Sequence, residues 1–154
     1  MIRVASLAAV LFAFTPAIAL AADDHVVVSA DQLKWNAAPP AFPKGAQLAV
    51  ITGDPSKEGL YVVRLKVPAG YKVSPHTHPF DENLTVISGT VQVGMGNKID
   101  EKATTAVKTG GFVKMPKGMA HYVVFPEETV LQVHGMGPQG LTYLNPADDP
   151  RKSK

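Results

Sequence analysis

Residues 70–89 read GYKVSPHTHPFDENLTVISG, and this stretch decides the fold assignment. His76 and His78 stand two positions apart, so on an extended strand their side chains point to the same face. Glu82 follows four positions after His78, across a proline-containing segment that can turn the chain back. The returning strand then brings a carboxylate beside the two imidazoles, which together form an incomplete metal site.

A second stretch, residues 110–125, reads GGFVKMPKGMAHYVVF and supplies a third histidine. His121 stands at the start of an expected strand, directly after the turn signal Pro116-Lys117-Gly118. Three imidazoles and a carboxylate form a mixed nitrogen and oxygen ligand set that suits divalent first-row metals. The residues therefore predict a site for a divalent metal ion.

The two stretches together resemble the two sequence motifs of the cupin superfamily. Gly70-x5-His76-x-His78-x3-Glu82-x6-Gly89 matches the first motif at every defined position, and Gly110-x5-Pro116-x-Gly118-x2-His121 matches the second. The second motif ends with Asn four residues after its histidine, where this chain has Phe125. Two separated motifs are far more specific than one short pattern.

The resemblance implies an all-β fold, a double-stranded β-helix (cupin, jelly-roll-like) barrel, with a metal in its mouth. The positions that correspond to the family's metal ligands are His76, His78, Glu82 and His121. The implied cofactor is a divalent transition metal (manganese, iron, zinc, nickel or copper), and the ligand set does not select among them. Two alternatives are a site of histidines alone and a site that uses Asp81, although the motif spacing favours Glu82.

The rest of the chain reads as short strands separated by turn residues, with no long segment of helical periodicity. The expected strands are 26–28, 48–52, 60–67, 84–87, 90–93, 111–115, 121–125, 130–134 and 141–144. Ser88-Gly89 signals a hairpin between two of them. We expect a signal peptide at 1–21, an N-terminal arm with the first strands at 22–58, the barrel at 59–145 and a surface tail at 146–154.

Composition excludes several classes of function. The chain has 154 residues, which suits one domain, and no cysteine, which excludes disulfides, thiolate nucleophiles, zinc fingers and iron–sulfur clusters. Fifteen basic and thirteen acidic side chains give a formal charge of +2. This balance gives no reason to expect nucleic acid or an acidic membrane surface as a partner.

The first 21 residues have the layout of a secretory signal peptide. Arg3 provides a positive charge, Val4–Phe14 is an apolar run, and Ala19-Leu20-Ala21 is a small-x-small cleavage signal. The apolar run is too short to span a bilayer as a helix. We therefore expect an exported protein, periplasmic or secreted, without membrane contact after cleavage. The alternative is a short membrane anchor or a buried N-terminal helix.

His134 is the candidate catalytic residue outside the ligand set. It shares strand parity with Val130 and Gln132, opposite Leu131 and Val133, so its face points either to solvent or into the pocket. Inside the barrel it would serve as acid, base or substrate contact. A structural role at the end of the strand is the alternative.

Side chains that share the parity of the ligands are expected to form the pocket wall or the core around it. Val123 and Phe125 have the parity of His121, and Leu84 and Val86 have that of Glu82. Met115 and Met119, which flank the second-motif turn, are grouped with them. An apolar wall with few polar groups suits a small, partly apolar ligand or substrate.

These features predict a metal-dependent cupin with a small-molecule pocket, a metalloenzyme of dioxygenase, isomerase or lyase type. Four protein ligands leave two positions of an octahedral metal for water, substrate or dioxygen. The alternative is a non-catalytic cupin that binds or senses a metal or small molecule, because fold and metal do not define the reaction. The resemblance also suggests a homodimer, and Trp35 is a candidate for its surface or for a barrel end.

Overall fold

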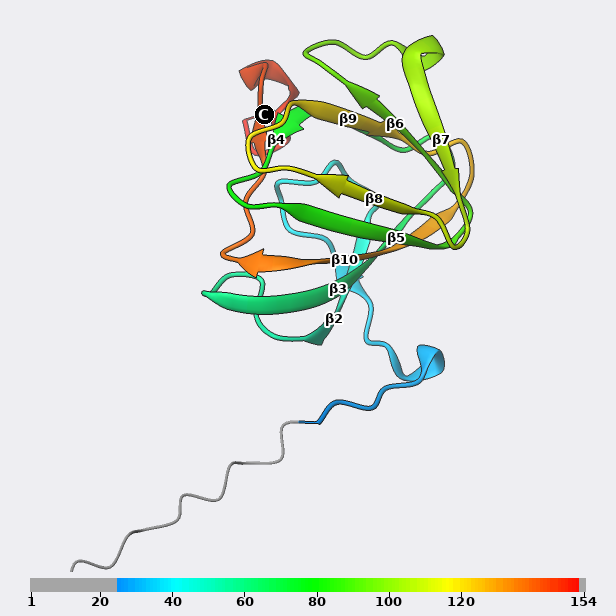
Figure 1. Ribbon diagram of the computed structural model, residues 1–154, viewed down its shortest axis with the longest axis vertical. Helices are drawn as coiled ribbons and strands as arrows, with labels where there is room; N and C mark the ends of the chain where they lie inside the picture. Colours follow the sequence, from blue (N-terminus) through cyan, green and yellow to red (C-terminus); the bar gives the residue numbers. More distant parts are fainter. Residues whose placement is uncertain (1–24, 153–154) are drawn as a thin grey trace, which may run out of the picture.

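The computed structural model describes residues 25–152 and forms two antiparallel sheets (Figure 1). The six-stranded sheet has the order β1-β2-β3-β10-β5-β8, and the five-stranded sheet has the order β11-β4-β9-β6-β7. The predicted signal peptide lies outside the described residues. The prediction of an all-β, double-stranded β-helix barrel is confirmed.

The six-stranded sheet contains β1 (Asn36–Ala37), β2 (Gln47–Thr52), β3 (Gly59–Val67), β5 (Glu82–Ser88), β8 (Phe112–Met115) and β10 (Thr129–Gly137). The five-stranded sheet contains β4 (Lys72–Thr77), β6 (Thr90–Met95), β7 (Thr104–Lys108), β9 (His121–Val124) and β11 (Thr142–Tyr143). The short 3-10 helices are η1 (Ala30–Gln32), η2 (Glu101–Ala103) and η3 (Pro146–Asp148). Within the described residues, no helix is both long and apolar enough to cross a membrane.

The core forms between the two sheets because the long strands alternate buried and outward side chains. In β3, Tyr61, Val63, Leu65 and Val67 are buried, and the residues between them face outward. The buried faces of β4, β5, β6, β9 and β10 join the same hydrophobic cluster. Because both sheets supply one apolar face, they pack as two layers with the site between them.

Eight of the nine expected strands are present, and the strand expected at Val26–Val28 is wrong. These residues have no regular secondary structure, and the side chain of Val27 is 88% exposed. Their β-branched side chains favour extended backbone, but no strand within the described chain pairs with them, and a strand is stabilised by such neighbours. The sequence reading also missed β1 and β7, which lie at or near sheet edges.

The hairpin expected at Ser88-Gly89 is also wrong, because β5 and β6 belong to different sheets. Gly89 has a φ of 81°, and a Cβ there would lie 2.5 Å from the carbonyl oxygen of Glu128. The buried Thr129 hydroxyl accepts from the Thr90 amide at 3.2 Å and also contacts the Thr90 carbonyl oxygen at 3.0 Å. This turn therefore carries the chain from one sheet to the other rather than closing a hairpin.

Two segments outside the long strands are fastened to the barrel. The N-terminal region is held through two of its carbonyl groups. The Pro43 carbonyl accepts from the Tyr71 hydroxyl at 2.7 Å, and the Ala41 carbonyl accepts from the Tyr143 hydroxyl at 2.8 Å. In the C-terminal tail, the buried Asp149 accepts hydrogen bonds from Arg151, and the Arg151 guanidinium also donates to the Leu141 carbonyl at 3.2 Å. Both segments are thus parts of the folded unit, and the first of them closes one end of the cavity described below.

Candidate metal centre

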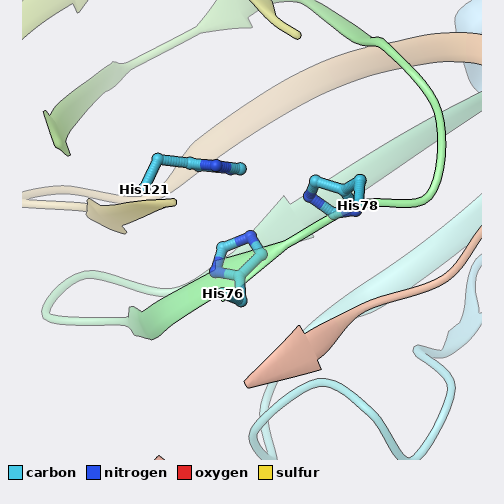
Figure 2. A group of neighbouring side chains, drawn as sticks. All are labelled: His76, His78 and His121. Carbon is cyan, nitrogen blue, oxygen red and sulfur yellow. The ribbon is translucent and has the colours of Figure 1, made fainter. Parts of the chain in front are cut away.

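The three motif histidines meet because two of them pair across neighbouring strands. His76, near the end of β4, is the register partner of His121, the first residue of β9. His78 is the first residue after β4, which ends at Thr77. The ring centroids lie 4.3 Å apart for His76 and His121, 4.9 Å for His76 and His78, and 5.3 Å for His78 and His121. Figure 2 shows the three rings gathered around one small space.

All three histidines are buried, with exposed fractions of 3% for His76, 8% for His78 and 2% for His121. One ring nitrogen from each lies within 4.8 Å of those of the other two, a spacing that allows them to hold one metal ion. Burying three adjacent imidazoles away from water costs free energy unless their polar nitrogens gain hydrogen-bond partners or a metal ion.

Backbone carbonyls determine which nitrogen faces the centre. Nδ1 of His76 lies 2.8 Å from the Ser74 oxygen, Nδ1 of His78 lies 2.7 Å from the Gly140 oxygen, and Nδ1 of His121 lies 3.0 Å from the Met119 oxygen. A carbonyl can only accept, so each Nδ1 carries a proton, and in the neutral imidazole Nε2 then presents its lone pair. A neutral imidazole with a free Nε2, held by such a partner, is the form that ligates metals.

The remaining buried polar atoms also call for a cation. Nε2 of His78 is buried and has no hydrogen-bond partner among the described residues. Glu82, which opens β5 in the other sheet, places Oε2 3.5 Å from that atom and 3.7 Å from Nε2 of His121. These distances are too long for hydrogen bonds. A divalent cation between the carboxylate and the imidazoles would satisfy these atoms together, so the residues present fit a metal.

The protonation states agree with this arrangement. Burial, followed by the proximity of His121 and His78, lowers the pKa of His76 to about 3. Burial by itself would raise the pKa of Glu82, but its contacts with His121 and His78 outweigh that effect and lower the pKa below the ordinary value. At neutral pH, His76 is therefore neutral and Glu82 is a carboxylate, which are the forms that bind a metal.

The site opens into a narrow apolar cavity between the sheets. The volume in which a water molecule can be centred is about 40 Å³, enough for a few waters or a compact ligand group. Besides the three histidines and Glu82, the wall consists of Phe42, Leu48, Val63, Leu65, Val73, Leu84, Val123, Phe125, Leu131, Val133, Gln139 and Leu141. Among the described residues of this wall, Gln139 is the one polar residue beyond the ligand set.

Most of the expected wall residues lie where strand parity places them. Leu84, Val123 and Phe125 line the cavity, and Val86 and Met115 belong to the buried core behind it. Met119 differs, because its side chain is 43% exposed. Its amide donates to the Pro116 carbonyl at 3.0 Å, which closes the turn and leaves the side chain on the outside.

The structure does not bring His134 to the site. Leu131 and Val133 line the cavity from β10, and His134 lies on the opposite face of that strand, beside Val62 and Asn83. Of the two orientations that the sequence left open for His134, the structure has the one that faces away from the cavity, so the catalytic role considered for this histidine finds no support in its position. Trp35 also lies away from the centre, with the ammonium of Lys66 5.0 Å from its ring centroid.

Nine of the twelve wall residues beyond the ligand set were not named from the sequence, and four of these nine come from the N-terminal region or from the segment after β10. Phe42 and Leu48 come from the N-terminal region, and Gln139 and Leu141 come from the segment after β10. None belongs to a motif. A weak signal existed for Phe42, because a large aromatic side chain contributes strongly to stability when it is buried.

A family model described as "Domain of unknown function (DUF4437)" matches residues 14–138. Germin-like protein 3-1 from Oryza sativa subsp. japonica is 29% identical over 109 residues, which cover 68% of this chain. The chain spans about half of that relative, 48% of its length.

Solved structures support the same assignment at the level of fold. The polyketide cyclase RemF from Streptomyces resistomycificus superimposes with a TM-score of 0.67 and 16% identity, covering 80% of this chain and 88% of the other. An RmlC-like cupin from Shewanella frigidimarina NCIMB 400 gives a TM-score of 0.57 and 15% identity, covering 74% and 91%. At these identities the likeness concerns the fold alone. With both motifs and this barrel present, the chain is a member of the cupin superfamily and belongs to the DUF4437 family.

Proposed function

We propose that the protein is an exported metal-dependent enzyme that converts a small, partly apolar organic molecule. The observation that carries this proposal is the arrangement of three buried histidines whose Nδ1 atoms all contact backbone carbonyls. Such an arrangement leaves the Nε2 atoms of three neighbouring rings available to one metal ion. Nε2 of His78 has no hydrogen-bond partner among the described residues. Glu82 is proposed as the fourth ligand.

The chain's own residues hold and orient the reactants. A divalent metal bound here supplies Lewis acidity and open coordination positions. The backbone carbonyls of Ser74, Gly140 and Met119 keep the imidazoles in one tautomer and orientation. The apolar wall excludes bulk water and strengthens electrostatic interactions within the cavity.

The lining limits the reaction class. Apart from the ligand set, the part of the cavity wall formed by residues 25–152 offers the carboxamide of Gln139 and no side chain that titrates near neutral pH. The wall therefore lacks the side chains that a reaction with a separate protein acid and base would need. We propose a reaction whose substrate coordinates through its own oxygen atoms, of the dioxygenase, isomerase or lyase type.

The same lining favours one alternative, a non-catalytic binding or sensor protein for a metal or small molecule. Incubating the metal-loaded protein with a panel of small oxygen-bearing substrates separates the two. Product that forms with the wild type and not with the His76→Ala variant supports an enzyme. Stoichiometric metal binding with no turnover across dioxygenase, isomerase and lyase substrates supports the binding protein.

Removal of the metal is expected to destabilise the fold. At a free metal concentration of 100 times Kd, binding adds about 2.7 kcal/mol to the free energy of unfolding. For a domain of this size that corresponds to roughly 5–10 °C in Tm. Differential scanning calorimetry with and without a chelator measures the shift, and re-addition of the metal restores it. An unchanged Tm in protein shown to lose its metal would contradict the ligand assignment.

The proposed export has its own test. Cleavage after Ala21 gives a mature protein that begins at Ala22, so N-terminal sequencing of protein from the culture medium or periplasm should read Ala-Asp-Asp-His. Protein recovered from the cytosol with its first 21 residues intact would refute export.

A further inference from the structure

The metal cavity adjoins a second, larger space on the surface, here called the outer cleft. Ala41, Pro55 and Ser56 line this cleft together with Phe42, Gln139 and Leu141, and the last three also line the metal cavity. The volume in which water can be centred is about 230 Å³ in the cleft, against about 40 Å³ in the cavity. Three side chains thus separate a compact inner space from a roomier outer one.

Both sides of this neck are held by hydrogen bonds. The Gln139 amide donates to the Pro55 carbonyl at 2.6 Å, which fixes the segment after β10 against the β2–β3 turn. On the other side, the Tyr143 hydroxyl donates to the carbonyl of Ala41, the residue before Phe42. The neck is therefore a built feature of the fold.

The neck is also tied to the metal ligands. The carbonyl of Gly140, directly after Gln139, contacts Nδ1 of His78 at 2.7 Å. Tyr143 is the register partner of His76 across β11 and β4. A ligand that passes between Phe42 and Gln139 is thereby placed close to the ligand set rather than at an unrelated surface.

We propose that the cavity and the outer cleft form one continuous binding site for a molecule with a compact, oxygen-bearing head and a larger apolar body. The head occupies the inner space beside the metal ligands, and the body lies in the cleft against Ala41, Pro55 and Phe42. Gln139 offers a carboxamide at the neck, where it can bind a polar atom between the two parts. This inference rests on the proposed metal-dependent function and specifies its substrate class.

Two hydroxamates with the same chelating head test the proposal. Acetohydroxamate fits the inner space alone, whereas octanohydroxamate carries a chain that must extend outward. Burial of each methylene improves affinity by about fourfold. In isothermal titration calorimetry of the Zn²⁺-loaded protein, we expect octanohydroxamate to bind at least tenfold more tightly than acetohydroxamate. Equal affinities, or tighter binding of acetohydroxamate, would overturn the continuous site.

A variant that fills the cleft tests the location. Ser56→Trp places an indole at the rim, and it should abolish the advantage of octanohydroxamate while acetohydroxamate binds as before. Thr109→Trp is the matched control, because Thr109 is exposed and does not line the cleft. It lies in the turn after β7, next to the end of β5 that is far from Glu82. An advantage retained in Ser56→Trp would contradict the proposal.

Titration of metal-free protein separates this inference from the proposed function. With octanohydroxamate, amide ¹H–¹⁵N shifts at Ser56, Gln139 and Leu141 would report the body in the cleft without any contribution from metal. Shifts at these amides in a protein that fails to load Zn²⁺ would support the cleft and refute the metal function. Normal Zn²⁺ loading without such shifts in either the metal-free or the Zn²⁺-loaded protein would support the metal function and refute the cleft.

Discussion

The His76→Ala variant is expected to bind divalent metal on the order of 10²–10³-fold more weakly than the wild type, because four ligands share a binding free energy of about 10–16 kcal/mol. His76 is 3% exposed and touches both other histidine rings, so its loss removes one ligand from the centre of the group. Competition with a chromophoric chelator measures the affinity. Any turnover found for the wild type should disappear with the metal.

The matched control for this variant is His134→Ala. His134 also lies in a barrel strand, but on the face of β10 opposite the cavity-lining Leu131 and Val133. Its removal should leave metal affinity within twofold of the wild type. His76→Gln, which keeps most of the side-chain volume, separates loss of a ligand from loss of packing. Weakened metal binding in His134→Ala, with normal binding in both His76 variants, would mean that His134 and not His76 is a metal ligand.

The second large effect is expected at Phe125, the position where the chain departs from the cupin motif. Its side chain is fully buried and packs against Tyr71, with ring centroids 6.0 Å apart. Phe125→Asn restores the motif residue but should destabilise the protein by about 4 kcal/mol or more, since loss of a buried ring costs about 3–5 kcal/mol and an unpaired buried amide adds about 1–3. That is a large share of the stability of about 5–15 kcal/mol of typical domains.

Urea denaturation followed by circular dichroism measures this effect. Phe125→Leu is the comparison variant and should cost only about 1–2 kcal/mol, because it keeps an apolar side chain in the same space. Neither variant removes a metal ligand, so metal affinity of the folded fraction should be unchanged. If Phe125→Asn were as stable as Phe125→Leu, the packing role given to this side chain would be wrong.

The sequence allowed the grouping of the three histidines to be predicted because each motif has a short, local spacing. A spacing of two residues places His76 and His78 on one side of an extended segment, and the second motif supplies His121 at the start of another strand. The structure adds the strand register that pairs His76 with His121. It also adds the carbonyl partners of the Nδ1 atoms, which follow from backbone geometry and leave no pattern in the sequence.

The cavity walls could not be predicted in the same way. Phe42 and Gln139 reach the site from irregular segments, where no periodicity relates a residue number to a direction. Strand parity correctly placed His134 on the same face of β10 as Gln132. It could not decide whether that face meets solvent or the pocket, because a polar face can do either. The misassigned turn at Gly89 has a similar cause, since a glycine turn fits a hairpin and a crossing between sheets equally well.

We expect one divalent metal to be held by His76, His78, His121 and Glu82, a claim that anomalous diffraction from crystals of the natively purified protein can test. The expected result is a single anomalous peak about 2.0–2.2 Å from each histidine Nε2 and from a Glu82 carboxylate oxygen, the range found for such ligands. Elemental analysis of the same sample should give one metal ion per chain. A peak that contacts Nδ1 atoms, lies beside His134, or is missing at full metal loading would contradict the claim.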